Sequence, residues 1–149
     1  MAQLQYHQTN GLPEAKVLSG IVGCMDAFMR TSPVKRWEEK FAERSNSLIQ
    51  WVTDGDDVVG FKAGYELRPG LFYSWLGGVS PSHRRQGIAK RLMAEQHQYA
   101  RSIGCKEIRT ISTNDHKHMM ILNLAVGFDI IETKAKGDET RIVMSLSIQ

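Results

Sequence analysis

The residues of this chain that are best suited to chemistry lie in one short stretch, where two arginines and a glycine precede an amphipathic segment. The sequence Arg-Arg-Gln-Gly spans residues 84–87, and apolar residues then recur at helical spacing from Ile88 onward. The first amides of a helix have no partner within the helix, and together with the helix dipole they attract anions. Gly87 would let an anion approach the backbone closely, and the two guanidinium groups add positive charge. The stretch therefore predicts a binding site for a phosphorylated ligand.

This stretch resembles the phosphate-binding loop of the GNAT superfamily of N-acetyltransferases. In that family the loop reads Gln or Arg, any two residues, Gly, any residue, and Gly or Ala; here Arg84, Gly87 and Ala89 stand at those places. The resemblance implies that acetyl-CoA is the ligand and that its pyrophosphate is bound by Arg84, Arg85, Gln86, Gly87, Ile88 and Ala89. Two other interpretations compete. One is a solvated basic turn, and the other is a nucleotide P-loop, which is disfavoured because no Gly-Lys-Ser or Gly-Lys-Thr follows the glycine.

A second part of the resemblance lies downstream, where Asn114 ends a predicted strand and a helix over 115–126 leads to a Gly-Phe pair. In the family the two central strands separate, so that backbone groups near the end of the first strand bind the pantetheine arm as an added strand would. Gly77 and Gly78 offer a place for that separation. The resemblance thus implies cofactor binding by Gly78, Val79 and Asn114. For Asn114, capping of the helix that follows is an equal alternative.

Two positions depart from the family pattern. Many relatives have a tyrosine four residues before the Gly-Phe pair, which protonates the departing thiolate of CoA, and this chain has Asn123 there. An amide cannot serve as that acid, so Asn123 is predicted to bind the cofactor through hydrogen bonds. The histone-acetylating branch has a glutamate base eleven residues before the phosphate loop, and this chain has Tyr73 there, a poor base at neutral pH.

The aromatic residues of the preceding strand are candidates for the acceptor site. Period-two alternation places Tyr73, Trp75 and Gly77 on one face of that strand. We expect Tyr73 and Trp75 to line the acceptor pocket, and Tyr73 is the remaining candidate for a catalytic side chain. That both are ordinary core aromatics is an equally good interpretation.

The histidines give weaker signals. His83 and His97 are predicted to lie at the surface and outside the site. His116 and His118 are two residues apart rather than four, which argues against a metal site. For His116, exposure on a helix is favoured over a role as a base. No metal is expected.

The rest of the chain alternates between strand and helix patterns around this site. An Asp-Gly turn at 54–57 joins two predicted strands, and a strand–helix–strand unit follows the early meander. This order predicts an α/β fold with a mixed six- or seven-stranded central sheet and helices on both faces. The predicted strands cover residues 4–7, 48–53, 58–66, 71–79, 106–113, 128–133 and 141–148; the predicted helices cover 34–44, 87–102 and 115–126, with one broken helix or two short ones over 13–28.

Length and composition limit the class of protein. With 149 residues, 42% of them hydrophobic, we expect a single domain over 1–149. The net charge of +3 suits a small anionic ligand better than nucleic acid, and neither a membrane span nor an export signal is expected, because the apolar runs are short. Cys24 and Cys105 lack the spaced companions of a zinc site or a disulfide framework, which indicates reduced thiols in a cytoplasmic protein.

Together these features predict transfer of acetyl from acetyl-CoA to a primary amine by direct attack in a ternary complex. A backbone N–H near Gly78 or Val79 would polarise the thioester carbonyl. The acceptor stays open among a small amine, an antibiotic, a protein N-terminus and a lysine, and so does homodimer formation. The alternative is a non-catalytic acyl-CoA-binding or sensing module, which the residues at 73 and 123 favour.

Overall fold

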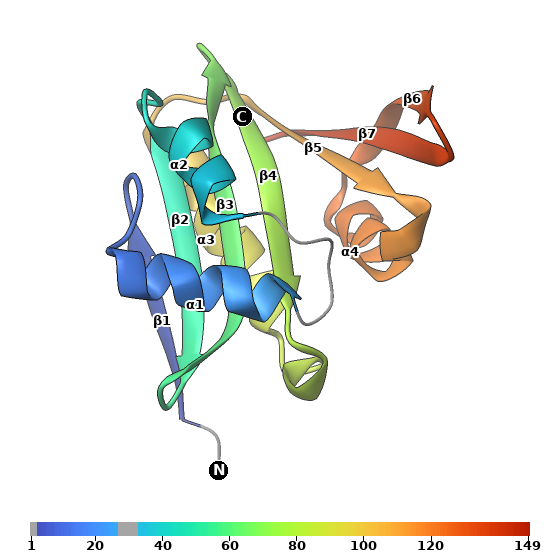
Figure 1. Cartoon of the computed structure of the whole chain (residues 1–149). Coiled ribbons are helices and arrows are strands. Elements are labelled where there is room, and N and C mark those ends of the chain that lie inside the picture. The colour runs from blue at the N-terminus through green and yellow to red at the C-terminus, as the bar shows by residue number, and fades with distance from the viewer. Residues whose placement is uncertain (1–2, 27–32) are drawn as a thin grey trace.

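The computed structural model describes residues 3–26 and 33–149 and shows one seven-stranded sheet in the order β1-β2-β3-β4-β5-β7-β6 (Figure 1). Neighbouring strands are antiparallel except β4 and β5, which are parallel, so the predicted mixed sheet is confirmed. The strands are β1 (Leu4–Thr9), β2 (Ser47–Asp54), β3 (Asp57–Arg68), β4 (Leu71–Val79), β5 (Glu107–Thr113), β6 (Asp129–Lys136) and β7 (Glu139–Ser147). The helices are α1 (Ala15–Asp26), α2 (Val34–Phe41), α3 (Ile88–Ser102) and α4 (Lys117–Val126).

Helices cover both faces of the sheet, as predicted. In Figure 1, α1 and α2 lie in front of the sheet and α3 lies behind it. Residues of α1 and α2 pack with Phe61 and Trp75 in one core, while residues of α3 and α4 pack with Phe72 and Ile108 in another. The sheet is therefore buried on two sides where the candidate site lies.

β4 and β5 are paired along only part of their length. Residues 71–74 of β4 pair with residues 107–110 of β5, and beyond these four pairs the strands separate. Where the separation begins, Thr110 Oγ1 donates a hydrogen bond of 3.0 Å to the carbonyl of Ser74. Figure 1 shows β5 diverging from β4 together with β7 and β6. The sequence places the separation at Gly77 and Gly78, and the structure shows that it begins earlier, directly after Ser74.

A bulge at Trp75 lies where the strands begin to separate. The pairing of β3 with β4 shifts between Ala63 and Gly64, which leaves Trp75 as an extra residue. Trp75 and Leu76 both pack on the side of α1 and α2, whereas Gly77 faces the side of α3. The prediction that Gly77 shares a face with Trp75 is therefore wrong, because a bulge reverses the alternation of every later residue in the strand.

The first helix is continuous across its two glycines. A Cβ atom at Gly20 would lie 2.9 Å from Cγ2 of Val58, so the glycine lets α1 pack closely on β3. A glycine inside a helix is unfavourable by itself, and this close packing is what offsets the loss. The end of the predicted segment, at Phe28, lies outside the described residues.

The later elements follow the predicted pattern with small shifts. The helix predicted from Asp115 begins as a single 3₁₀ turn over Asn114–His116 and becomes α-helical at Lys117. β6 is exposed along its whole length at one edge of the sheet. Of the helices in the described part of the chain, none combines the length and hydropathy needed to cross a membrane.

Candidate active site

The separation of β4 and β5 opens a cavity of about 860 Å³. Arg36 and Trp75 line it on the face covered by α2, and Gln96 and His97 of α3 line it on the other face. Residues 110–113 of β5 form a further part of its wall. The cavity therefore passes between the two strands and connects both faces of the sheet.

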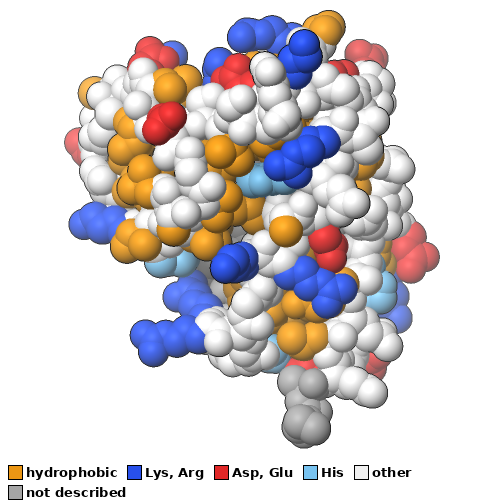
Figure 2. Space-filling model, turned by 180° about the vertical axis from the view of Figure 1, so that it is seen from behind, with side chains coloured by type: hydrophobic (Ala, Val, Ile, Leu, Met, Phe, Trp, Pro, Cys, Tyr) orange, Lys and Arg blue, Asp and Glu red, His pale blue; other side chains and the backbone are white. Residues whose placement is uncertain are grey.

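Of the six predicted phosphate-binding residues in the loop before α3, one, Arg84, is in the lining of this cavity. Its Nε donates a hydrogen bond of 3.3 Å to the carbonyl of Val79. Arg85 and Gly87 have positive φ values of 63° and 77°, which turn the chain so that α3 begins at Ile88. No described side chain caps this helix, so its first amides can bind an anion. Basic side chains project over this loop at the lower left of Figure 2.

The other predicted cofactor residues around the loop have different surroundings. Gln86 is exposed, whereas Ile88 is buried in a core with Val52 and Val59 and so anchors the start of α3. Gly78 lines the main cavity, and Val79 and Ala89 line a small hollow beside it. The structure thus brings the ends of β4 and the first turn of α3 together, as the resemblance implies.

Of the two asparagines predicted to bind cofactor, only one faces the cavity. Asn123 is 5% exposed, lines the cavity, and donates from Nδ2 to Sδ of Met144 at 3.8 Å. Asn114 is exposed and is not among the cavity-lining residues. The capping alternative for Asn114 is not observed, because neither the 3₁₀ turn nor α4 has a side-chain cap from a described residue, and cofactor contact by Asn114 stays a prediction.

Tyr73 and Trp75 of β4 lie on the face opposite α3. Trp75 is buried, with ring-centroid distances of 5.0 Å to Trp37 and 5.7 Å to Phe41, yet it also lines the cavity. Lys40 Nζ and the guanidinium of Arg36 lie 5.3 Å and 5.9 Å from its ring centroid. This end of the cavity is therefore both aromatic and cationic.

Tyr73 lies beside this end but is not one of the cavity-lining residues. Its ring packs edge-on against Tyr65 at 5.7 Å. Burial raises the pKa of Tyr73, with a smaller lowering effect from Arg141 and Arg36, so its hydroxyl stays protonated at neutral pH. Tyr73 therefore packs against the core beside the cavity, and contact with an acceptor stays a prediction.

Sequence reasoning missed two titratable residues of the cavity, Lys62 and His97. His97 was predicted at the surface, but it is 6% exposed and lies on the face of α3 that carries Met93 and Ala100. Burial, with help from the charges of Lys62 and Arg101, lowers the pKa of His97 to about 4, so the ring is neutral. Burial also lowers the pKa of Lys62 to about 8. The position of His97 four residues after Met93 is a signal that could have found it.

His116 and His118 also line the cavity, so exposure on a helix is an incomplete description of them. Their ring centroids are 6.5 Å apart. Burial, Arg84 and His116 lower the pKa of His118. Within residues 3–26 and 33–149, no group of three or more His, Cys, Asp and Glu side chains is arranged to hold a metal ion.

Comparisons with known proteins give a consistent result. The profile described as the acetyltransferase (GNAT) family matches residues 21–127, more than half of the chain. No curated protein matches the sequence at a significant level.

Several solved structures share the fold. The ribosomal-protein-S18-alanine N-acetyltransferase from Escherichia coli is 16% identical, with a TM-score of 0.80 over 97% of this chain and 94% of that chain. Ard1 from Thermoplasma volcanium is 15% identical, with a TM-score of 0.80 over 97% and 98%. An aminoglycoside 6'-N-acetyltransferase complexed with coenzyme A is 14% identical, with a TM-score of 0.78 over 96% and 97%. The parted sheet, the uncapped helix behind an Arg-Arg-Gln-Gly loop and the family match lead to one conclusion: the chain belongs to the GNAT family of acetyltransferases.

Proposed function

We propose that this protein transfers the acetyl group of acetyl-CoA to a primary amine. The observation that carries the proposal is the cavity through the sheet, with uncapped helix amides at one end and Trp75 with two cations at the other. Acetyl-CoA has a matching form, because a charged nucleotide end is joined by a narrow arm to the thioester. The start of α3 would bind the pyrophosphate, and the unpaired edge of β4 would bind the arm.

Direct attack by the amine requires no protein nucleophile. The acceptor would approach from the side of α2, while a backbone N–H near Gly78 or Val79 would polarise the thioester carbonyl. The amine would lose its proton through water or a nearby side chain. Much of the rate would then come from holding the two substrates in line.

The charges at the acceptor end favour an amine that also carries an anionic group. Arg36 and Lys40 are four residues apart on α2, and Arg44 follows just after the end of the helix. The charges of Arg36 and Arg44 both act on Lys40 and lower its pKa, so the three cations repel one another. The guanidinium of Arg44 lies 4.1 Å from the ring centroid of Tyr65, so the row continues over the aromatic face. Glu139 also lines the cavity, but it is paired with Arg141 at 3.5 Å. A carboxylate or phosphate on the acceptor would relieve the repulsion.

The test is a panel of amines followed through release of the CoA thiol. We expect turnover with at least one amine, and amino acids or acidic peptides should react faster than polyamines. Acetyl-CoA binding without release for any amine would instead support the non-catalytic acyl-CoA-binding or sensing module, which Asn123 and Tyr73 continue to favour.

Replacing Asn123 with Ala is expected to weaken acetyl-CoA binding by two- to tenfold, because one buried amide hydrogen bond is worth about 0.5 to 1.5 kcal/mol. Turnover at saturating cofactor should fall little. Calorimetry and steady-state rates separate the two effects. Normal affinity with turnover lowered by about a hundredfold or more would show that Asn123 takes part in the chemical step.

Replacing Tyr73 with Phe is expected to leave both the melting temperature and acetyl-CoA affinity almost unchanged, since the ring and its packing remain. If the hydroxyl contacts the acceptor, kcat/KM for the acceptor should fall about threefold to tenfold, in keeping with one lost hydrogen bond. Normal kinetics combined with a lower melting temperature would assign Tyr73 to the core alone.

We also propose a homodimer in which two β6 strands pair edge to edge. β6 is exposed throughout, and Ile130 and Ile131 are half exposed. Antiparallel pairing of two copies would set Asp129 of one beside Lys136 of the other, so the charges match. Figure 2 shows hydrophobic side chains gathered at the upper left, the side to which β6 and α4 turn in that view. Sedimentation should give a dimer, and Ile130→Lys should give a monomer.

The buried free thiols of Cys24 and Cys105 support placing the protein in the cytoplasm. Burial raises the pKa of each to about 11, so neither is a reactive thiolate.

A further inference from the structure

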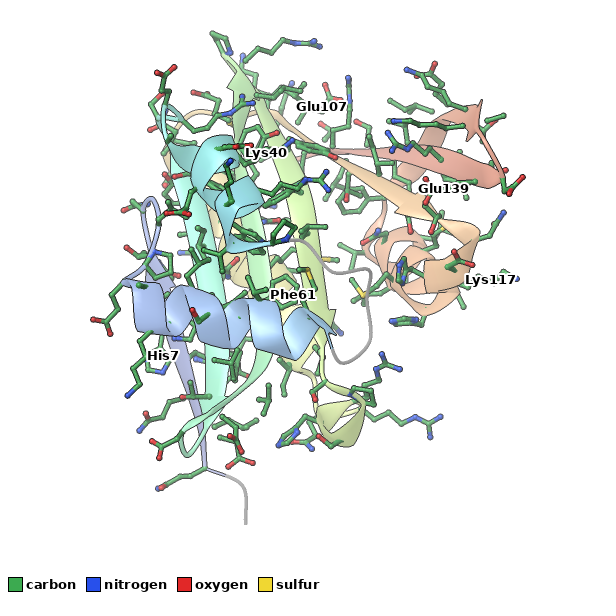
Figure 3. The ribbon with its side chains drawn as sticks, viewed as in Figure 1. His7, Lys40, Phe61, Glu107, Lys117 and Glu139 are labelled. Carbon is green, nitrogen blue, oxygen red and sulfur yellow. The ribbon has the colours of Figure 1, made fainter. Side chains whose placement is uncertain are left out.

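Lys62 of β3 lies on the face of the sheet that α3 covers. Its neighbours Phe61 and Ala63 belong to the core under α1 and α2, and Phe61 is seen on that side in Figure 3. Because successive residues of a strand point to opposite faces, the Lys62 side chain points toward Gln96 and His97 of α3. It is only 8% exposed.

This buried lysine has no opposite charge beside it. Across the described ranges 3–26 and 33–149, the side chain of Lys62 forms no hydrogen bond and no ion pair. Both side-chain amide atoms of Gln96 also lack partners, as does Oε1 of Gln50, which stands opposite Lys62 in β2. Buried polar groups without partners are costly and rare. The cluster therefore indicates a polar ligand in the adjoining cavity.

Gly77 connects Lys62 with that cavity. The two residues are paired, and a Cβ atom at Gly77 would lie 3.3 Å from Cγ and 3.5 Å from Nζ of Lys62. With no side chain at Gly77, the amine can extend along this position toward the gap beside β4, and both residues line the cavity. Along β4 the lining runs from Ser74 and Trp75 at the acceptor end past Gly77 toward Arg84 at the phosphate end. Lys62 thus lies between the two ends, where the thioester would be.

We propose that Lys62 is the acid that protonates the departing sulfur of CoA. This inference rests on the acetyl transfer proposed above. The acceptor nitrogen bonds to the carbonyl carbon, the carbon–sulfur bond breaks with its electron pair on sulfur, and the Lys62 ammonium gives that sulfur a proton. The attacking amine loses its extra proton to water, and water returns one to Lys62. The role is open in this chain because Asn123 cannot donate a proton of suitable acidity.

The acidity of Lys62 suits this step. Burial lowers its pKa from 10.5 to about 8, which is close to the value of about 8.5 for a free thiol, so proton transfer between them is nearly balanced. The one titratable group facing it from α3, His97, has a pKa lowered to about 4 and is neutral. The remaining charged or titratable groups that line the cavity are Arg36, Arg84, Asp115, His116, His118 and Glu139. Since the ammonium form is the acid, kcat should be high below about pH 8 and fall above it.

Lys62→Met tests the proposal, because it keeps the length of the side chain and removes the proton. We expect kcat to fall by about a hundredfold and the alkaline limb of its pH profile to disappear, with acetyl-CoA affinity preserved. Lys62→Arg keeps the charge but cannot release a proton near neutral pH, and it should not restore turnover. Lys106→Met is the matched control on an exposed lysine and should leave kcat and its pH profile unchanged.

Stability tests separately whether Lys62 is buried without a partner. Folding lowers the pKa of Lys62, so the lysine destabilises the folded state as the pH falls from 10.5, and the effect is complete below about pH 8. Lys62→Met should therefore raise the melting temperature at neutral pH, and the gain should shrink as the pH approaches 10.5. A variant that melts lower and keeps normal turnover would overturn the proposal, and so would full turnover in Lys62→Arg.

Binding of CoA itself tests Lys62 without any turnover. At the end of the proposed transfer, Lys62 and the CoA sulfur hold one proton between them, whereas free Lys62 and the free thiol together hold nearly two at pH 7.5. CoA should therefore release most of one proton on binding at that pH, as measured by calorimetry in two buffers. Lys62→Met with CoA, and the wild type with desulfo-CoA, should release none. Equal proton release by wild type and Lys62→Met would overturn the role of Lys62. Absence of amine turnover in a protein that shows the expected release would overturn only the proposed acetyl transfer.

Discussion

Replacing Gly87 with Glu is expected to lower the affinity for acetyl-CoA by about a hundredfold or more. The new carboxylate would stand at the first turn of α3, where the pyrophosphate is proposed to bind, and would repel it while losing charge-assisted hydrogen bonds worth about 1.5 to 3 kcal/mol each. A Cβ atom at Gly87 meets nothing within 4 Å, so the fold has room for the side chain. Its φ of 77° adds a backbone cost of about 1 kcal/mol.

Gly87→Asn is the matched control, because asparagine tolerates the left-handed region and carries no charge. It should bind acetyl-CoA within about tenfold of the wild type. Calorimetry on variants that still melt cooperatively measures both. Unchanged affinity in Gly87→Glu would remove the basis for placing the cofactor at this helix.

Replacing Gly64 with Ala should destabilise the protein by about 3 kcal/mol or more, the upper part of the range for overpacking. A Cβ atom there would lie 2.6 Å from the carbonyl oxygen of Tyr73 and 2.6 Å from Cε1 of Phe72. The first contact is with backbone, which cannot move aside without disturbing the bulge at Trp75. Urea denaturation followed by circular dichroism would measure the change.

Gly23→Ala is the same chemical change at a site of opposite character. Gly23 is exposed on α1, and a Cβ atom there meets nothing within 4 Å. Alanine should stabilise the helix by about 0.5 to 1 kcal/mol. If both substitutions had the same sign, close packing at Gly64 would not be the reason for its glycine.

Periodicity and turn residues were sufficient to predict most of the fold. The strand pair around Gly55 and the helix from Ile88 to Ser102 have local signals, because turns depend on a few residues and amphipathic faces repeat along the chain. The start of α3 directly after the Arg-Arg-Gln-Gly loop was predictable for the same reason, and anion binding there stays a prediction.

The bulge at Trp75 and the burial of Lys62 had no such signal. A bulge is defined by the pairing of two strands, and the sequence of one strand does not contain its register. A lysine between apolar residues in a strand normally indicates a solvated face. Here α3 covers that face of the sheet, and both Lys62 and His97 are buried between α3 and the strands. This packing joins segments far apart in the sequence, so the residues around Lys62 and His97 do not reveal it.

The short pairing of β4 with β5 joins two parts of the sheet that differ in how far apart their paired residues lie in the sequence. β2, β3 and β4 follow one another through two-residue turns, so their pairing closes short loops and costs little chain entropy. Joining β5 to β4 requires α3 to form and cross over first. On a growing chain, the first strands can therefore assemble before the cavity exists. Leu48 and Phe72 then stay exposed to solvent until α3 covers them. The binding site is then the last part of the molecule to be completed.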